Sequence, residues 1–264
     1  MPELAEVEYS RKRWDPGMGQ KVLKVLLHAE KRIFRGTDIK LLQSTLPGST
    51  LLRSEAGGKQ MVFQFSKGLW LGIHLGMTGE MRVEKSDYLP AKHDHLVLVQ
   101  KKQALVLEDC RQFGRVRFAN SKTPPEWWAS IPKPLTSASF TAKSMEEFLQ
   151  RHRKLPIKAC LLLQNGFPGV GNWMADEILW RARLNPHVLS GSINGKRAQA
   201  LWKQIRFVCQ AAIRHIGDDW SDVPKNWLFH ERWKKAGLCP RHQVPLRRET
   251  IGGRTTAWCA QCQE

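Results

Sequence analysis

The chain opens with a proline followed by an acidic residue. Met1 is usually removed when a small residue follows it, so we expect a mature chain whose Pro2 secondary amine stands beside the Glu3 carboxyl group. An α-amino group has a reference pKa of about 7.7 to 8.0, so much of it is neutral near pH 7. A neutral amine next to a carboxylic acid can attack an electrophilic carbon and form a Schiff base while the acid moves the proton. The alternative is that these residues only cap a first helix.

Four soft metal ligands are grouped near the other end of the chain. Two residues separate Cys239 from His242 and Cys259 from Cys262, and Gly252-Gly253 between the pairs predicts a hairpin turn. This ligand set is typical of a tetrahedral zinc site, and four protein ligands leave no open position, so we predict one structural zinc ion per chain. The alternative is a chance group of reduced cysteines. Arg254 follows the hairpin turn and is placed to reach a phosphate.

The composition points to a polyanionic partner. The 264 residues include 42 Lys and Arg against 24 Asp and Glu, which gives a net charge of +18 and a pI near 10.0. Such an excess without long apolar runs favours nucleic acid binding. The sequence has no 18-residue apolar run and no signal-peptide pattern, so we expect a soluble cytoplasmic protein without membrane contact.

Several basic and apolar side chains stand where strands begin or end. Lys59 shares the parity of buried-face residues 61, 63 and 65, so it is predicted to start a strand and face a cleft or, alternatively, to reach out to water. His74 has the opposite parity to its apolar neighbours, and Met77 lies in a Gly-flanked turn. Each has a structural alternative: His74 can be a histidine whose hydrogen bonds are made within the fold, and Met77 a loosely packed turn residue. An exposed methionine can instead wedge into a base stack.

Two loops combine basic and aromatic groups. Arg111 and Phe113 follow a predicted strand with a two-residue spacing, which suits an arginine that hydrogen-bonds and a ring that stacks in a duplex gap, or else a cation and ring packed on the sheet edge. His93 lies in a Lys-His-Asp-His stretch that fits no metal-ligand spacing well. A solvated turn or a contact to a nucleic acid backbone is the better interpretation.

A glycine-rich turn at residues 164–172 opens a predicted helix at Asn172. Exposed backbone N–H groups at a helix N-terminus suit a phosphate, although a plain turn between helices remains the alternative. Arg153, shortly before this pair of helices, adds positive charge.

These residues are carried by an expected α+β multidomain fold. Strands at 22–27, 61–65, 69–75, 96–99 and 104–107, after a helix at about 7–14, predict an N-terminal β-sandwich. Helices at 145–152, 157–164, 173–184 and 195–216 follow a Pro-rich stretch. The expected domains are the sandwich (1–120), a linker (121–141), a helical domain (142–234) and the zinc-binding hairpin (235–264).

Five motifs, in the same order along the chain, together resemble those of the formamidopyrimidine-DNA glycosylases and their endonuclease VIII relatives. The resemblance is closer to the formamidopyrimidine-DNA glycosylase branch. The motifs are Pro-Glu-Leu-x-Glu-Val-Glu at the start, His-Leu-Gly-Met-Thr-Gly from His74, Asp-x-Arg-x-Phe-Gly around Arg111, Gly-Val-Gly-Asn ending at Asn172, and Gly-Arg-Thr-Thr around Arg254. The resemblance spans nearly the whole chain.

We expect a nucleoid-associated monomer. The resemblance implies an enzyme of base-excision repair that removes oxidised bases from duplex DNA and nicks the strand. It implies that Pro2 is the Schiff-base nucleophile, Glu3 the proton donor, Lys59 and Arg254 the donors for β- and δ-elimination, and Glu6 a neighbour of the flipped nucleotide. The DNA contacts it implies are His74, His93, Arg111, Arg153 and Asn172, with Met77, Arg111 and Phe113 filling the gap left by the extruded base. Residues 166–172 correspond to the helix-two-turn-helix loop.

Some positions depart from the family pattern. Ala5 replaces a proline, Gln112 replaces a second arginine and His242 replaces a cysteine, a change that zinc accepts. Residues 217–235 look little like the loop that closes over 8-oxoguanine in many members. The preferred lesion is therefore open between formamidopyrimidines, 8-oxoguanine and oxidised pyrimidines. A non-catalytic DNA-binding protein is the alternative from another class, although it would not need an acid beside its terminus.

Overall fold

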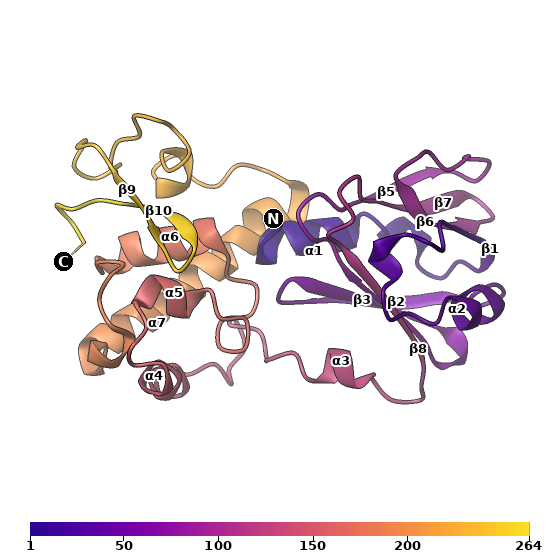
Figure 1. Cartoon of the computed structure of the whole chain (residues 1–264), viewed down its shortest axis with the longest axis horizontal. Coiled ribbons are helices and arrows are strands. Elements are labelled where there is room, and N and C mark those ends of the chain that lie inside the picture. Colours follow the sequence, from indigo (N-terminus) through magenta and orange to yellow (C-terminus); the bar gives the residue numbers. More distant parts are fainter. Residues whose placement is uncertain (264) are drawn as a thin grey trace. The chain divides into compact units, whose positions relative to one another are not determined.

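The computed structural model describes residues 1–263 and divides into two compact units (Figure 1). The first comprises Met1–Pro2 and Glu6–Ile131, and the second comprises Glu3–Ala5 and the chain from Pro132 onward. The first helix, α1 (Leu4–Lys12), therefore has its first two residues in the second unit and the rest in the first. None of the helices in the described part of the chain is both long enough and apolar enough to cross a bilayer.

Two four-stranded antiparallel sheets form the first unit. In one sheet the order is β1 (Val22–Leu27), β6 (Asp94–Gln100), β7 (Gln103–Glu108) and β5 (Glu80–Lys85). In the other it is β2 (Leu51–Gly57), β3 (Gln60–Phe65), β4 (Leu69–His74) and β8 (Arg115–Asn120).

The inner faces of these two sheets share one hydrophobic core. Phe63 and Leu71 from one sheet and Leu98 and Leu105 from the other are fully buried in the same cluster, together with Trp14. Trp14 packs on Phe63 with ring centroids 4.8 Å apart. Alternate side chains along each strand thus point into a shared interior, which confirms the predicted β-sandwich.

The predicted and observed elements of the first unit differ in several places. The strands β2, β5 and β8 were not predicted, because charged residues interrupt their apolar pattern. The helix α2 (Ile39–Thr45) was not predicted either, and its N-terminus is capped because the Asp38 carboxylate accepts the Leu41 N–H. Lys59 does not start a strand. It lies with Gly58 in the tight turn between β2 and β3, where Gly58 has a φ of +60°.

Helices and one hairpin form the second unit. The helices are α4 (Ala142–Arg151), α5 (Ile157–Leu161), α6 (Asn172–Ala182) and α7 (Gly195–Ala212), with a wider π-helical turn at Ile213–Gly217, and the hairpin is β9 (Arg247–Ile251) and β10 (Arg254–Trp258). A short helix, α3 (Glu126–Ala129), lies inside the expected linker and belongs to the first unit. The domain boundaries drawn from the sequence otherwise stay predictions.

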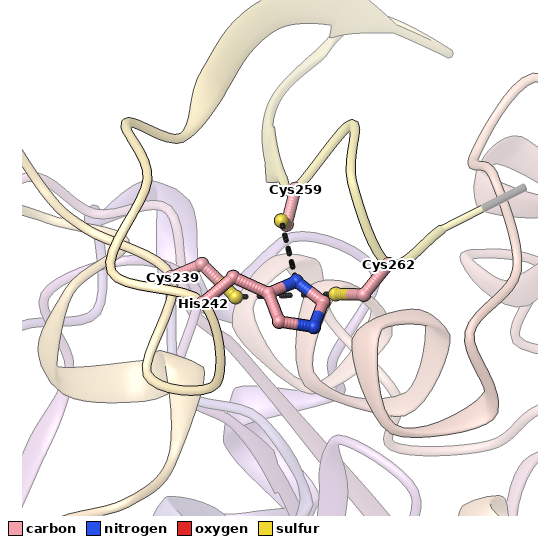
Figure 2. Close-up of side chains that lie close together, drawn as sticks. All are labelled: Cys239, His242, Cys259 and Cys262. Atoms are coloured by element: carbon pink, nitrogen blue, oxygen red, sulfur yellow. Dashed lines mark hydrogen bonds between the residues drawn. The ribbon is translucent and has the colours of Figure 1, made fainter.

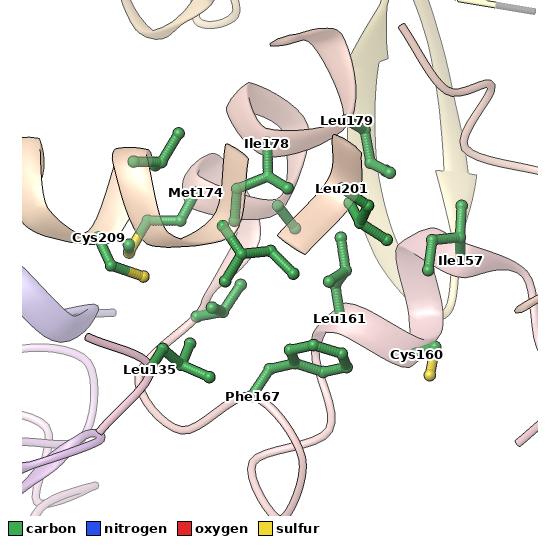
Figure 3. Packing of buried hydrophobic residues seen from close by; sticks show 14 of the residues in the cluster. Leu135, Ile157, Cys160, Leu161, Phe167, Met174, Ile178, Leu179, Leu201 and Cys209 are labelled. Carbon is green, nitrogen blue, oxygen red and sulfur yellow. The ribbon is translucent and has the colours of Figure 1, made fainter. Parts of the chain in front are cut away.

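The core of the second unit lies among its helices (Figure 3). Phe167 from the loop before α6 packs with Leu161 of α5, Met174 and Ile178 of α6, and Leu201 of α7, all of them fully buried. The core therefore fixes the loop that leads into α6, and this loop carries the glycines described below.

Candidate nucleic-acid interface and metal centre

The Glu3 carboxylate lies at the N-terminus of α6. Its Oε2 accepts the backbone N–H groups of Gly171 (3.0 Å) and Met174 (3.1 Å), and its Oε1 accepts that of Trp173 (3.0 Å). The side chain is buried, with 4% of its surface exposed. Three N–H donors at the positive end of a helix stabilise a carboxylate and fix its orientation. The acid beside the proposed nucleophile is therefore held rigidly.

Gly171 is required by the closeness of Glu3. A Cβ at residue 171 would lie 2.2 Å from the Cδ and 2.4 Å from the Oε1 of Glu3. Next to this contact, the Leu4 N–H donates to the carbonyl of Gly169, 3.0 Å away, and Gly169 has a φ of +87°. The glycine-rich loop therefore binds residues 3 and 4, a role that was not predicted for it.

Asn172 ties the start of α6 to the hairpin that carries Arg254. Its Nδ2 donates to the carbonyl of Thr255, 2.8 Å away, while its Oδ1 is buried without a hydrogen-bond partner. A Cβ at Gly252 would lie 2.8 Å from the Cβ of Ala159, so the hairpin tip packs closely on α5. The exposed Arg254 side chain consequently starts from a fixed backbone.

A buried ionic cluster that was not predicted from the sequence lies next to Asn172. Asp176 of α6 accepts hydrogen bonds from Lys158 and, at 2.7 Å, from the Nη2 of Arg232, and its Oδ2 also accepts the Ala257 N–H at 3.1 Å. Lys158 in turn donates to the carbonyl of Asn172 at 2.8 Å. Burial lowers the pKa of the Lys158 ammonium, and the Asp176 carboxylate opposes that effect. The cluster joins α5, α6 and β10.

The predicted zinc ligands converge on one point (Figure 2). The ligand atoms of Cys239, His242, Cys259 and Cys262 all lie within 4.8 Å of one another. The Sγ atoms of Cys239 and Cys262 are 3.9 Å apart, as are the Cys259 Sγ and the His242 Nδ1. With zinc–sulfur bonds of about 2.3 Å, a tetrahedral site needs sulfur–sulfur edges of about 3.8 Å. The four side chains therefore fit a tetrahedral metal ion.

The surroundings of this cluster also suit a metal–thiolate site. The indole Nε1 of Trp180, on α6, donates to the Cys239 Sγ at 3.3 Å. An N–H donor to a ligand sulfur stabilises its thiolate form and holds its orientation. Trp180 also packs with Cys239, Cys259 and Cys262 in one small core, so the metal site and α6 support each other.

The proposed gap-filling residues lie together in the first unit. Met77 and Phe113 are 42% and 41% exposed, and the guanidinium of Arg111 lies 4.6 Å from the centroid of the Phe113 ring. A Cβ at Gly76, which has a φ of +65°, would lie 2.4 Å from the carbonyl carbon of Phe113. The two loops thus touch backbone to backbone, which only glycine permits.

Asp109 holds both of these loops. Its Oδ1 accepts the Thr78 hydroxyl at 2.8 Å, and its Oδ2 accepts the Gly114 N–H at 2.7 Å. The side chain is buried. Three exposed residues on two separate loops are therefore positioned by one carboxylate, a role that the motif around Arg111 does not reveal.

His74 ends β4 with its ring half-buried. Its Nδ1 accepts the Gly76 N–H at 3.0 Å, which assigns the remaining ring proton of a neutral imidazole to Nε2. Burial lowers the pKa of His74, and the nearby charges of Lys59 and Arg35 lower it further. The ring is accordingly a neutral donor near pH 7.

The remaining sequence candidates have simpler surroundings. His93 is half-buried, and its carbonyl accepts the Asp109 N–H at 3.0 Å. The neighbouring Asp94 carboxylate accepts hydrogen bonds from Arg82 and Tyr88, so these two side chains hold the stretch that carries His93. Arg153 is exposed in the second unit, where its carbonyl accepts the Gly191 N–H at 3.2 Å.

A two-sheet sandwich, a helical unit with a glycine-rich helix start and a Cys₃His hairpin define a helix-two-turn-helix protein with a metal-binding hairpin. The model of the formamidopyrimidine-DNA glycosylase N-terminal domain matches residues 1–116, and that of the formamidopyrimidine-DNA glycosylase H2TH domain matches residues 131–222. The chain belongs to the formamidopyrimidine-DNA glycosylase family.

Individual proteins agree with this assignment. The formamidopyrimidine-DNA glycosylase of Thermus thermophilus is 33% identical over 276 residues, which cover 100% of this chain and 98% of that protein. Fpg (MutM) of Lactococcus lactis, solved with DNA containing an oxidised pyrimidine, superposes with a TM-score of 0.87 at 27% identity over 100% of both chains. MutM solved with DNA containing carbocyclic 8-oxo-G gives a TM-score of 0.87 at 26% identity, also over 100% of both chains. The family predicted from the sequence is thus confirmed.

Proposed function

We propose that the protein is a bifunctional DNA glycosylase and AP lyase that excises oxidised bases from duplex DNA. The observation that carries the proposal is the Glu3 carboxylate, fixed by three backbone N–H groups directly after Pro2. Met1 is 52% exposed, so an aminopeptidase can reach it. Removal of Met1 leaves the Pro2 secondary amine next to an oriented acid–base group.

In the first half-reaction, a bond from C1′ to the Pro2 nitrogen replaces the bond from C1′ to the base. The Pro2 nitrogen bonds to C1′ of the sugar, and the C1′–N bond breaks with its electron pair leaving on the base. The amine loses its proton to the Glu3 carboxylate. Glu3 then returns the proton to O4′ as the C1′–O4′ bond breaks, which opens the sugar and leaves an iminium ion on Pro2. One carboxylate thus serves as acceptor and then as donor.

Strand cleavage follows from the iminium ion. It acidifies the C2′ proton, so that proton is removed and the C3′–O bond breaks with the electron pair leaving on the 3′-phosphate, which is β-elimination. A second elimination breaks the C5′–O bond. We assign the donor roles in these two steps to Lys59 and Arg254, and place Glu6 beside the extruded nucleotide, on the strength of the family motifs.

DNA binding is assigned to groups in both units. The phosphate and backbone contacts are His74, His93, Arg111, Arg153 and Asn172. Extruding a base costs a few kcal/mol, and an apolar side chain and a stacked ring that enter the gap offset this cost. The juxtaposed Met77, Arg111 and Phe113 supply those groups. The net charge of +18 supports salt-sensitive binding to the phosphate backbone.

The metal in the Cys₃His cluster is proposed to be zinc. The fit of four soft ligands to a tetrahedral arrangement supports this identity. A bound zinc ion would supply structural cross-linking, and Cys239, His242, Cys259 and Cys262 would hold it. Its effect on function is indirect, since the hairpin positions Arg254.

The preferred lesion is proposed to be a formamidopyrimidine or 8-oxoguanine, with oxidised pyrimidines as the alternative. Membership of the formamidopyrimidine-DNA glycosylase family supports the two purine lesions. The Lactococcus lactis protein solved with an oxidised pyrimidine, and the departure of residues 217–235 from the family pattern, support testing the oxidised pyrimidines. A panel of duplexes, each carrying one lesion, separates them by the rate of base release.

Borohydride trapping tests the central proposal. The protein is incubated with a duplex carrying an abasic site or 8-oxoguanine, and borohydride reduces any imine to a stable covalent complex. We expect a covalent band with the mature chain and none with a chain that carries one extra residue before Pro2. A band that persists with the blocked terminus would overturn Pro2 as the nucleophile. Tight DNA binding without any band would favour a non-catalytic binder.

A further inference from the structure

Three arginines line a cavity on the outer face of the β2-β3-β4-β8 sheet. The cavity has a volume of about 240 Å³, and Arg35, Arg115 and Arg117 share its wall with Gln60, His74 and Phe113. All of these residues belong to the first unit. None of the three arginines has a role in the function proposed above.

The strand register places two of the arginines. Side chains alternate along β8, so Val116 points into the buried core while Arg115 and Arg117 point to the opposite face. Arg115 is paired with His74 and Arg117 with Gly72 on the neighbouring strand β4. Gly72 has no side chain, so the position across from Arg117 leaves room for the ring of Trp127.

Packing holds the arginine side chains at the cavity. The Trp127 ring lies over Gly72, where a Cβ would come within 2.5 Å of it, and the Arg117 guanidinium lies 5.8 Å from the centroid of that ring. A Cβ at Gly36 would lie 3.3 Å from the Nη2 of Arg115, so this guanidinium rests against the turn that follows Arg35. The cavity is therefore built from ordered side chains.

The charges in the cavity are not balanced by an acid. Arg35 donates to backbone carbonyls, those of Gly114 at 2.7 Å and Arg32 at 3.1 Å. The Nε of Arg115 is buried and has no hydrogen-bond partner. Burial lowers the pKa of both Arg35 and Arg117, and the charge of Arg115 lowers each further. Like charges that converge without a counter-ion destabilise the protein, and a bound anion removes that cost.

We propose that this cavity, hereafter the arginine pocket, binds a phosphate group of the DNA. The planar guanidinium forks match phosphate oxygens, and the Nε2–H of His74 adds a neutral donor. Phe113 lines the same cavity and belongs to the proposed gap-filling set, so the bound phosphate is expected close to the lesion. This inference rests on the proposed function and adds to it a phosphate subsite formed by Arg35, Arg115 and Arg117.

Two sources can supply this phosphate. One is an internal phosphodiester of the intact strand, and the other is the terminal phosphate that elimination leaves at the nick. Both have the same oxygens for the arginines to bind, but only the second requires cleavage. Binding to an uncut duplex and to nicked duplexes with and without the terminal phosphate distinguishes them.

The salt dependence of DNA binding tests the arginine pocket. Each phosphate contact contributes about 0.9 to the slope of log K against log salt concentration. We expect Arg117→Gln and Arg115→Gln to weaken binding roughly 10-fold and to lower that slope by about 1, while Arg117→Lys keeps the slope. Arg53→Gln is the matched control, because Arg53 is an exposed arginine on β2 of the same sheet with Glu55 3.7 Å away. Thermal unfolding checks that each variant is folded.

The pattern across duplexes decides the result. A lower slope on the uncut duplex identifies an internal phosphodiester, and a loss confined to the duplex with the terminal phosphate identifies the cleaved end. The proposal is overturned if the Arg115 and Arg117 variants have the salt slope of the wild type on every duplex. It is also overturned if Arg53→Gln lowers the slope by the same amount. Borohydride trapping separates this failure from that of the proposed function. If the wild type is trapped but the arginine variants keep its salt slope, only the arginine pocket is ruled out. If the wild type does not bind DNA at all, both the pocket and the proposed function are ruled out.

Discussion

The Oε2 of Glu3 lies 3.0 Å from the backbone nitrogen of Gly171, 168 positions further along the chain. This hydrogen bond places the acid at the start of α6 and explains why residue 171 is a glycine. The Glu3 side chain occupies the space that a Cβ at residue 171 would need. A larger residue at position 171 would therefore displace the Glu3 carboxylate while leaving Glu3 itself unchanged.

Gly171→Ala is expected to slow base excision about 100-fold, because a displacement of about 1 Å in a reacting group can cost that much. The added methyl group pushes the Glu3 carboxylate off its three N–H donors. Single-turnover base release measures the effect. Glu3→Gln, which keeps the side-chain shape, should cost at least as much. Normal excision by Gly171→Ala in a folded protein would show that the observed position of Glu3 is not the working one.

His74→Gln is expected to weaken DNA binding by about 1.5–3 kcal/mol, the range for a hydrogen bond to a charged group. The slope of affinity against salt should stay unchanged, since a neutral imidazole neutralises no phosphate. The lowered pKa of His74 leaves the ring neutral above its ordinary value of about 6.5, so the contribution of His74 should be flat from pH 6.5 to 8.

Salt and pH titrations of binding, with His187→Gln as the exposed control in the second unit, check this prediction. A contribution that grows as the pH falls from 8 to 6.5 would mean that a charged imidazolium makes the contact.

The sequence predicted the fold where one pattern dominated. Residues 61, 63 and 65 are apolar at every second position and form the core-facing side of β3. The paired Cys-x-x-His and Cys-x-x-Cys spacings predicted a cluster that the structure brings together. Short-range periodicity and ligand spacing are local properties, so the sequence alone reveals them.

Long-range contacts were out of reach. Nothing near Asp176 in the sequence indicates that Lys158 and Arg232 bind it, because these partners are 18 and 56 residues away. The arginine pocket had a local signal, since Arg115 and Arg117 have the alternation of one strand face. The charges of β8 hid the strand, however, and Arg35 joins the pair only through the tertiary fold.

Cys262→Ser is expected to lower the zinc content from one ion per chain to less than one and to destabilise the hairpin, since a structural metal contributes directly to folding. Trp180 of α6 packs on the ligand sulfurs, so the thermal unfolding temperature should fall as well. Metal analysis of the folded protein measures the first effect. Cys110→Ser is the control, because Cys110 is exposed and outside the cluster. Folded wild-type protein without any metal would remove the zinc site.

Asp176→Asn is expected to lower the free energy of unfolding by about 3–5 kcal/mol, the usual cost of leaving a buried charge uncompensated. Lys158 is fully buried and Arg232 is 3% exposed, so neither cation can turn to water when the carboxylate is lost. Urea unfolding measures the change. Asp222→Asn, at an exposed position in the same unit, should stay within about 0.5 kcal/mol of the wild type.

The pH dependence of this deficit identifies its cause. Burial lowers the pKa of Lys158, and losing Asp176 lowers it further, so the folded variant binds fewer protons at this site than the unfolded chain does. Stability then rises with pH, because the unfolded state is the one that releases protons as the pH increases. The deficit of Asp176→Asn should therefore be smaller at pH 9 than at pH 7. A deficit that is independent of pH would place the cost in the lost Ala257 and Arg232 hydrogen bonds instead of in an uncompensated Lys158.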